Sequence, residues 1–362
     1  MISLLSAFFS SFIATLLIIR FEHVHSHFSA DSDLSGPQKF HKNAVPRIGG
    51  VSIALGVLMA VLLKIQANGN SATEITLLVC AIPVFAIGLT EDLTKKISVR
   101  MRLFFTAIGA LIATNLLGIQ IMGLDIPGID YFLGFSPIAI VFTVFAVTGL
   151  SNAYNIIDGF NGLSSMVGMI TLMALGYMSY VLTDPMMISL SFIMAAAILG
   201  FFVWNYPRGL IFLGDGGAYL IGFWIAIISI MLVSRHGNVS PWFALLVNGY
   251  PILETLFTIY RRKMHQGKSP GQPDGIHFHS LIFRRVLSIG KGGIKQDDWF
   301  TKNARTSPYL WVLTSMAIIP AILWWQSTPI LVGFFALYIL SYTWLYKRIV
   351  SFRTPRWLHP IK

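Results

Sequence analysis

The chain has 362 residues, of which 55% are hydrophobic and only 11% are charged, whereas roughly 25% of the residues of an average soluble domain are charged. With a mean hydropathy of +0.70, this composition excludes a water-soluble globule and indicates a protein dissolved in the lipid bilayer. The net charge of +11 could also suit nucleic acid, but no Lys or Arg occurs between Arg102 and Arg208. Positive charge confined to a few loops is typical of membrane topology and argues against a nucleic-acid partner. The single cysteine, Cys80, excludes a disulfide framework and a cysteine-based metal site.

Eleven apolar segments are long enough to cross a bilayer as α-helices, because a hydrocarbon core of about 30 Å needs about 20 apolar residues. They predict an all-α, polytopic membrane bundle that forms a single domain. The first segment lacks the basic start and the small-residue cleavage site of a signal peptide, so it is predicted to be a retained helix. In chain order, the predicted spans are Ile2–Ile19, Ile48–Leu63, Ile75–Leu89, Leu103–Ile121, Pro137–Leu150, Leu163–Leu182, Met186–Tyr206, Ala218–Val233, Trp242–Tyr260, Tyr309–Trp325 and Pro329–Tyr346.

The distribution of Lys and Arg predicts which side of the membrane is cytoplasmic. Of the 26 such residues, all but Lys64 and Arg235 fall in loops on one side of the eleven spans. Because cytoplasmic loops are enriched in Lys and Arg, the N-terminus is predicted outside and the C-terminus inside a cell membrane. The largest cytoplasmic loop, residues 261–308, is predicted to hold a short helix near Leu281–Leu287.

Five polar motifs lie at the ends of the predicted spans, and the topology places all five on the cytoplasmic face. The first covers residues 41–50, where Lys42 and Arg47 supply positive charge and Gly49-Gly50 lets the backbone approach an anion closely. This pattern indicates a phosphate site, although basic residues flanking the start of a span would give the same sequence.

The second motif is Glu91-Asp92, which directly follows the third predicted span. Adjacent carboxylates repel each other unless a cation or metal compensates, so such a pair suits metal binding or proton abstraction. The alternative is a solvated acidic turn, balanced by the bases Lys95, Lys96, Arg100 and Arg102.

The third motif covers residues 152–163, between two very apolar spans. Asn152, Asn155 and Asp158 recur every third residue, so in helical form they would share one face of the connecting loop. Glycines at positions 159 and 162 would break that helix and expose backbone N–H groups. A polar stripe of this kind is costly at the membrane edge without partners, and it therefore indicates function.

The fourth motif is Gly-Asp-Gly-Gly at residues 214–217, at the start of the eighth span. Asp215 could simply cap that helix. Together with Asp158 it could instead hold a hard divalent cation, because Mg²⁺ favours one or two carboxylates plus substrate phosphate oxygens. Asn205, ten residues earlier, offers a further polar contact.

The fifth motif, residues 274–279, lies in the large loop. His277 and His279 could bind zinc, but no third ligand of the usual kind lies nearby, so the motif instead indicates recognition of a phosphate or a sugar. Glu254 is the one charge within a predicted span, and its carboxylate is expected to pair with Arg261 or Arg262.

Together, the five motifs resemble those of the polyprenyl-phosphate N-acetylhexosamine-1-phosphate transferases of glycosyltransferase family 4, in the same order from about residue 41 to residue 285. The resemblance implies a membrane enzyme that moves a sugar 1-phosphate from a UDP-sugar to undecaprenyl phosphate. It also implies Mg²⁺ or Mn²⁺ as cofactor, UMP as the released product and a cell-surface glycan as the polymer begun. The form Asp-x-x-His-x-His of the fifth motif is more similar to the branch using N-acetylglucosamine-type donors than to the branch that makes the first lipid intermediate of peptidoglycan.

The resemblance also implies roles for single residues. Asp215 and Asp158 are the expected metal ligands, and Asn155 belongs with Asp158 to the catalytic stripe. Asp92 is the candidate to accept a proton or to orient the acceptor, whereas Glu91 stands where the family usually has a second aspartate, and Ser280 where it often has a third histidine. The residues expected to bind the substrates are Lys42, Arg47, Asn152, Gly159, Phe160, Asn161, Asn205, Phe212, His277 and His279, of which Gly159, Phe160, Asn161 and Phe212 would line the uridine pocket.

A transporter of nucleotide sugars or lipid-linked sugars is the alternative function. Transporters place polar residues near the bilayer midplane on broken helices, often within inverted repeats. The sequence predicts neither feature and gathers its polar residues at one face, which favours the enzyme. Its expected partners are the UDP-sugar, undecaprenyl phosphate and the bilayer, while a homodimer is left open.

Overall fold

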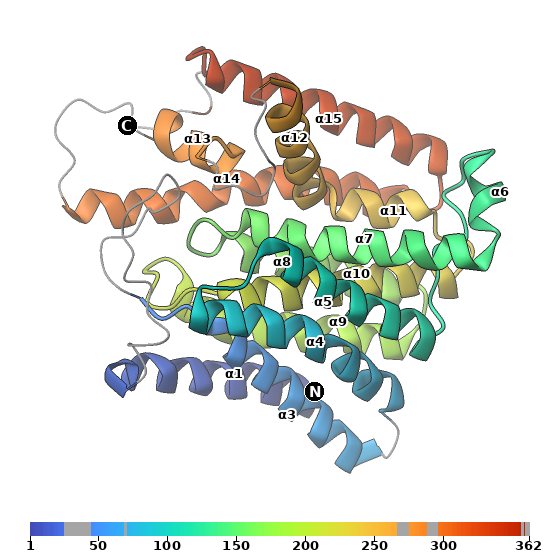
Figure 1. Cartoon of the computed structure of the whole chain (residues 1–362), viewed down its shortest axis with the longest axis horizontal. Helices are drawn as coiled ribbons and strands as arrows, with labels where there is room; N and C mark the ends of the chain where they lie inside the picture. The colour runs from blue at the N-terminus through green and yellow to red at the C-terminus, as the bar shows by residue number, and fades with distance from the viewer. Residues whose placement is uncertain (25–44, 69–70, 266–274, 288–295, 356–357, 359–362) are drawn as a thin grey trace.

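The computed structural model describes residues 1–24, 45–68, 71–265, 275–287, 296–355 and 358. Every extended secondary-structure element in these residues is a helix (Figure 1), so the predicted all-α class is confirmed. The helices are α1 (Ile2–Arg20), α3 (Gly49–Asn68), α4 (Ala72–Thr94), α5 (Val99–Leu116), α6 (Ile129–Leu133), α7 (Ser136–Ile157), α8 (Leu163–Val181), α9 (Pro185–Asn205), α10 (Gly214–Arg235), α11 (Pro241–Val247), α12 (Gly249–His265), α13 (Phe278–Leu281), the π-helix η1 (Ile282–Val286), α14 (Gln296–Leu323) and α15 (Thr328–Val350).

Ten of these helices are long and apolar enough to cross a membrane, or eleven if the bent pair α11 and α12 is one span. The chain is thus a multi-pass membrane protein, and the predicted spans all find a helical counterpart. The continuous ninth span predicted over Trp242–Tyr260 is wrong, because the chain bends by 76° between α11 and α12. The side-chain amide of Asn248 donates hydrogen bonds to the carbonyl of Ala244 (2.9 Å) and to Ser229 Oγ (3.2 Å), so polar partners inside the bundle stabilise the break.

Several helices extend further than the apolar pattern predicted, and for three of them the extension bears on the motifs and the large loop. The helix α4 continues through Glu91 and Asp92 to Thr94, and α7 continues to Ile157, so the second motif and most of the third lie on helices and not in loops. The helix α14 begins at Gln296, within the predicted large loop, and the predicted short helix of that loop is present as α13 and η1. Helices extend beyond their apolar stretch here because their polar side chains find partners in neighbouring helices, as described below.

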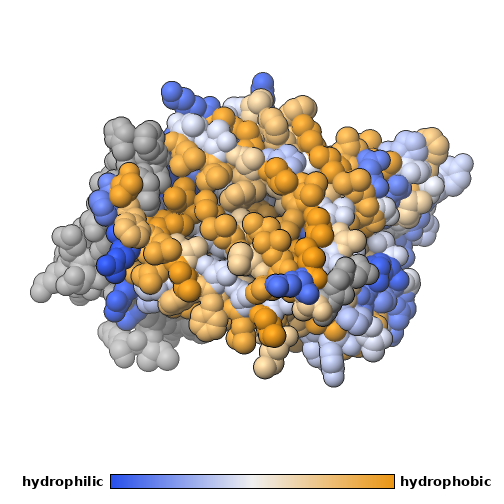
Figure 2. Space-filling view, turned by 90° about the horizontal axis from the view of Figure 1, so that it is seen from below, coloured by the Kyte–Doolittle hydropathy of each residue, from blue (hydrophilic) through white to orange (hydrophobic). Residues whose placement is uncertain are grey.

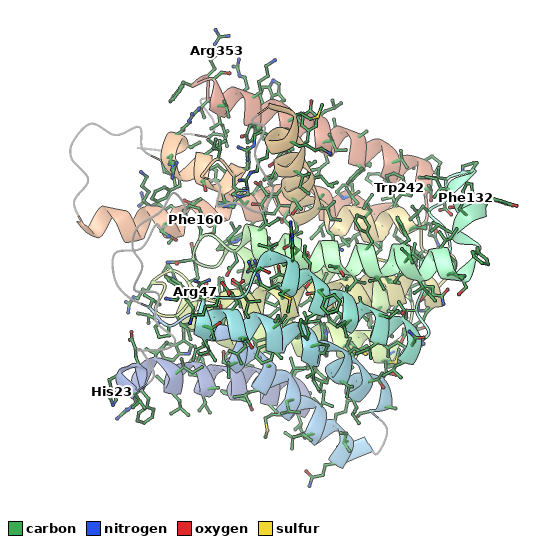
Figure 3. All side chains as sticks on the ribbon, viewed as in Figure 1. His23, Arg47, Phe132, Phe160, Trp242 and Arg353 are labelled. Carbon is green, nitrogen blue, oxygen red and sulfur yellow. The ribbon has the colours of Figure 1, made fainter. Side chains whose placement is uncertain are left out.

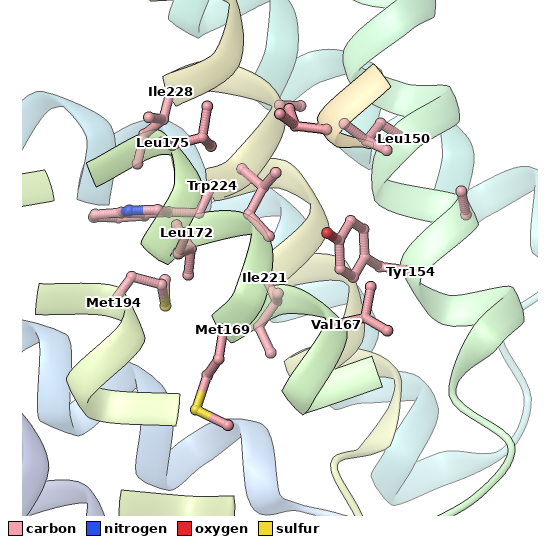
Figure 4. Close-up of a cluster of buried hydrophobic side chains, with 14 of the residues drawn as sticks. Leu150, Tyr154, Val167, Met169, Leu172, Leu175, Met194, Ile221, Trp224 and Ile228 are labelled. Carbon is pink, nitrogen blue, oxygen red and sulfur yellow. The ribbon is translucent and has the colours of Figure 1, made fainter. Parts of the chain in front are cut away.

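The helix α10 forms the centre of the bundle. Its candidate membrane-spanning stretch is 94% buried, and it packs against α3, α4, α7, α8 and α9. A helix that is hydrophobic on all sides is expected in such a position. Figure 4 shows part of this core, in which Tyr154, Leu172, Ile221 and Trp224 pack together from α7, α8 and α10.

The bundle has two chemically distinct ends. Figure 3 shows Arg47 and Phe160 toward one end, with His23 and Arg353, and Phe132 and Trp242 at the other. We call the first the motif end and the second, which carries α6, the hairpin end. Figure 2 shows a broad apolar band across the middle of one face, with hydrophilic residues gathered mainly toward the two ends. This pattern is the one expected of a bundle that spans a bilayer along its long axis.

Candidate active site

The first and fourth motifs are joined by backbone hydrogen bonds at the motif end. The N–H of Phe212 donates to the carbonyl of Pro46 (2.8 Å), and the N–H of Gly49 donates to the carbonyl of Phe212 (3.0 Å). The contact is close because Gly214 adopts a φ of +75°, and a Cβ there would lie 1.9 Å from the carbonyl oxygen of Arg47. Only glycine fits, so the fourth motif delivers Asp215 directly beside the first.

The second motif meets the fourth through Asp92. This carboxylate is 1% exposed, and its two oxygens accept hydrogen bonds from the backbone N–H groups of Asp215 (2.8 Å) and Gly216 (2.9 Å). A carboxylate is well placed at the N-terminus of α10, where N–H groups lack helical partners and the helix dipole is positive. Asp92 therefore holds α4 to α10 and fixes the backbone from which Asp215 projects.

Asp215 is buried between two arginines. Its Oδ1 lies 3.4 Å from Nη2 of Arg47, and its Oδ2 is in contact with Nη1 of Arg102. The same Arg47 nitrogen lies 3.9 Å from Oδ1 of Asp92. Arg102, which the sequence offered only as one of four bases balancing an acidic turn, thus contacts Asp215 of the fourth motif. The guanidinium groups also provide positive charge at the place where anionic phosphates are expected.

The third motif continues the polar surface along α7. The hydroxyl of Tyr219 donates to Oδ1 of Asn152 (2.8 Å), and it lies within hydrogen-bonding reach of the Asn155 side chain. Asp158 is the residue that ends α7. Burial raises the pKa of its carboxyl to about 7, while the Arg47 guanidinium partly offsets that rise. Asp158 is close enough to Asp92 for the two charges to interact.

Glu91 has a different setting from Asp92. Its Oε2 accepts a hydrogen bond from the backbone N–H of Ile97 (2.7 Å), which closes the turn between α4 and α5. The neighbouring Lys95 adopts a left-handed conformation with a φ of +55° at the end of α4. Glu91 therefore stabilises the turn that leads to Arg102.

The fifth motif packs against the third. A Cβ added to Gly159 would lie 3.0 Å from Nε2 of His279, so the imidazole rests on the backbone directly after Asp158. The rings of Phe160 and His279 meet edge to face with centroids 5.5 Å apart, and His277 stacks on His279 at 5.1 Å. The two histidines therefore enter the same site as the three aspartates.

The predicted partner of Glu254 is corrected by the structure. Its Oε1 lies 3.0 Å from Nδ1 of His277 and accepts a hydrogen bond from the N–H of Phe278 (3.1 Å), and its Oε2 accepts one from the hydroxyl of Tyr342 (2.7 Å). The pairing expected with a neighbouring arginine of α12 is replaced by contacts to the His motif and to α15. The reason is the 76° bend, which turns α12 so that Glu254 lies beside the fifth motif.

The predicted substrate-binding residues Asn161 and Asn205 bond to the backbone of neighbouring loops. The amide of Asn161 donates to the carbonyl of Pro207 (3.1 Å), and its backbone N–H donates to Oδ1 of Asn303 (3.0 Å). Asn205 accepts from the N–H of Gly162 (2.6 Å) and donates to the carbonyl of Ile211 (2.7 Å). Both amides are buried and hold the loop after α7 in place.

The structure brings residues of the five motifs together at the motif end, for the part of each motif that it describes. Arg47, Asp92 and Asp215 contact one another, and the Gly159 backbone meets His279. Lys42 lies outside the described residues. Sequence reasoning missed Arg102, Tyr219, Asn303 and Tyr342, because each of them makes its contact with a residue far away in the chain.

The carboxylates could hold a divalent cation only if other ligands completed its shell. Among the residues described, no cluster of three or more His, Cys, Asp or Glu side chains could hold a metal by itself. Mg²⁺ requires only one or two carboxylates where phosphate oxygens and water complete its shell. Asp215 and Asp158 provide hard oxygen donors of this kind, in a site where Asp92 adds a third carboxyl group.

Comparison with known proteins gives a consistent result. The family model described as glycosyl transferase family 4 matches residues 74–233. An undecaprenyl-phosphate alpha-N-acetylglucosaminyl 1-phosphate transferase of Yersinia pestis is 30% identical over 254 residues, 68% of each chain. An enzyme of the same name from Haemophilus influenzae is 28% identical over 100% of this chain and 98% of its own, and one from Thermotoga maritima is 29% identical over 70% and 73%. On these matches, the chain belongs to glycosyl transferase family 4.

Proposed function

We propose that this protein transfers a sugar 1-phosphate from a UDP-N-acetylhexosamine to undecaprenyl phosphate, with release of UMP. The observation that carries the proposal is the meeting of Arg47, Asp92, Asp158, Asp215 and His279 at one end of the bundle. Family membership and the names of the relatives support an undecaprenyl phosphate acceptor and an N-acetylglucosamine-type donor. The product begins a cell-surface glycan.

The reaction joins two anions. An oxygen of the lipid phosphate attacks the β-phosphorus of the donor, a new P–O bond forms, and the bond from the β-phosphorus to the bridging oxygen breaks, so that UMP leaves with the electron pair. Positive charge must offset the repulsion between the phosphates. Arg47 and Arg102 bring two guanidinium groups to this position, and Lys42 is expected to add a third cation from the first motif.

The metal part of the proposal assigns Mg²⁺, or Mn²⁺, to Asp215 and Asp158. When bound, the ion would polarise the donor phosphates and neutralise the charge of the departing UMP. The two arginines that contact the Asp215 carboxylate lie beside this position. These guanidiniums would then be available to the phosphates that complete the metal site.

The substrate contacts follow from the position of each motif. We assign the uridine to the surface of Gly159, Phe160 and Phe212, and the donor phosphates or sugar to His277 and His279. Asn152 and Asn155 face Tyr219 on the same wall of the site. Asn161 and Asn205 stabilise this wall, because their side-chain amides donate hydrogen bonds to the backbone carbonyls of Pro207 and Ile211. The role of Asp92 as proton acceptor or as orienting group for the acceptor phosphate stays a prediction, and it would add to the contact with α10 described above.

The proposal places the motif end at the cytoplasmic face of the inner membrane, because nearly all Lys and Arg residues lie at the predicted loops of that side. The transporter is not favoured, because the polar motifs meet at one end of the bundle and the relatives are transferases.

The test is an assay of the purified protein in detergent with UDP-N-acetylglucosamine, undecaprenyl phosphate and Mg²⁺. UMP and a lipid-linked diphosphate sugar are expected in equal amounts, and EDTA should stop both. A panel of other UDP-N-acetylhexosamines would identify the donor. Absence of UMP with every donor, together with passage of a nucleotide sugar into vesicles, would overturn the proposal in favour of transport.

A further inference from the structure

A buried carboxylate lies beside the His motif, on a helix to which the proposed function assigns no role. Glu254 is 1% exposed and belongs to α12. Three groups bind it, namely His277 Nδ1 (3.0 Å), the N–H of Phe278 (3.1 Å) and the hydroxyl of Tyr342 (2.7 Å). Burying a carboxylate inside a membrane bundle costs hydration free energy on the order of several kcal/mol. Its hydrogen bonds must offset that cost. An apolar side chain would join α12 to α15 at lower cost, so the carboxylate calls for another explanation.

The contact of Glu254 with His277 fixes the state of that ring. A carboxylate oxygen only accepts hydrogen bonds, so the proton of the imidazole must lie on Nδ1, with Thr258 Oγ1 as a second neighbour at 3.3 Å. The two ring nitrogens lie on opposite sides of an imidazole. Nε2 of His277 therefore points away from Glu254. An acidic partner commonly fixes the tautomer and orientation of a functional histidine in this way.

The orientation of His277 extends to the rest of the site. Its ring stacks on that of His279, with planes 16° apart. His279 in turn rests on Gly159, next to Asp158. A continuous series of contacts thus leads from Glu254 to the loop that carries a candidate metal ligand.

We propose that Glu254 is a positioning residue for the transfer reaction, which sets the tautomer and angle of His277 so that the two histidines hold the donor. The inference rests on the proposed function, because it takes the His motif to bind the UDP-sugar. It goes beyond that function by adding α12 to the machinery of the site, through a residue that does not touch substrate itself.

The test is a double-mutant cycle on the purified protein. Glu254→Leu removes the acceptor of three hydrogen bonds, His277→Ala removes the ring, and the third variant combines both. Glu254→Leu should lower kcat/KM for the donor by about 10–100-fold, the usual effect of losing an acidic partner of a functional histidine. The KM for undecaprenyl phosphate should not change. In the His277→Ala background the same substitution should have no further effect, because Glu254 acts through that ring.

Two further variants separate positioning from packing. Glu254→Gln keeps an acceptor oxygen for His277 and should restore most of the donor kcat/KM. Tyr342→Phe removes a hydrogen bond from the same carboxylate without touching His277, and should remain near wild type. If the Leu variant is not recovered as monodisperse protein, Glu254→Asp takes its place in the cycle, since its shorter side chain cannot reach Nδ1.

Each outcome decides the inference. Effects of Glu254 and His277 that multiply in the double variant, an unchanged donor kcat/KM in Glu254→Leu, or equal losses for donor and acceptor would each overturn it and leave the transferase activity intact. If the wild-type protein releases no UMP from any donor, the proposed function fails and this inference fails with it.

Discussion

The two ends of the bundle use ion pairs in different ways. At the hairpin end, Lys64 pairs with Glu74, and Arg235 Nε lies 2.8 Å from Asp184 Oδ2. Each pair there joins one cation to one acid near the turns between spans. At the motif end, by contrast, Asp92, Asp158 and Asp215 come from distant parts of the chain and share two arginines. A site with more carboxyl groups than cations is suited to bind a cationic ligand, whereas one-to-one ion pairs are suited to stabilise the fold.

The strongest test of this contrast removes one carboxylate from the motif end. Asp215→Asn and Asp92→Asn should each lower UMP release by more than about 100-fold, which is typical when a site loses a group that stabilises developing charge. The first removes the proposed metal ligand, and the second turns an amide N–H toward the N–H groups of α10. Both proteins should still insert, as judged by their amount in the membrane fraction. Full activity in either variant would remove that aspartate from the mechanism.

An intermediate effect is expected from breaking a matched pair. Glu74→Gln leaves Lys64, whose side chain is 18% exposed, without its carboxylate. Loss of a partner for a mostly buried charge should lower the free energy of unfolding by about 1–3 kcal/mol. The thermal unfolding midpoint in detergent should fall, while UMP release per folded molecule at low temperature stays unchanged. A loss of activity as large as that of Asp215→Asn would contradict the division between the two ends.

The smallest effect is expected at the more exposed pair. The Arg235 side chain is 47% exposed, so Arg235→Gln should cost less than about 1 kcal/mol. Although burial alone would raise the pKa of Asp184, the hydrogen bonds from Arg235, the Met187 N–H and His236 hold that pKa below its ordinary value of 3.8. A carboxyl with a lowered pKa stabilises the fold above that ordinary value, and the stabilisation is lost as the pH falls below it.

The measurement for this pair is the thermal midpoint at neutral pH and below pH 3.8. The difference between the two conditions should be smaller in Arg235→Gln than in the wild type, because part of the pKa shift is gone. An equal difference in both proteins would show that the pair does not contribute to acid sensitivity.

The number and positions of the membrane spans could be predicted well, because they depend on one property, the length of each apolar segment. Every predicted span has a helical counterpart. The break at Asn248 could not be predicted, since a single Asn-Gly pair within an apolar run gives no direction of bending. Hydropathy predicts that α4 and α7 end several residues too early. It does not account for hydrogen-bond partners such as Tyr219, which let a polar stripe continue a helix.

The sequence predicted which acidic residues belong to the candidate site better than it predicted which residues contact one another. Asp92, Asp158 and Asp215 stood out as acids beside apolar helices. Arg102 did not, because a base beside the cytoplasmic end of a span is what topology already requires. The partners of Glu254 were assigned by closeness in sequence, whereas Tyr342 lies 88 residues away. Contacts between distant helices depend on packing that a single sequence does not reveal.

The bend between α11 and α12 has a mechanical consequence. Two neighbouring helices hold the break, since the side-chain amide of Asn248 donates to Ser229 Oγ of α10 (3.2 Å) and the hydroxyl of Thr171 in α8 donates to the carbonyl of Val247 (3.4 Å). A kink that is hydrogen-bonded to helices on two sides is expected to be rigid and not to act as a hinge. The arm beyond it, which carries Glu254, therefore keeps one angle relative to the core while substrates enter and leave.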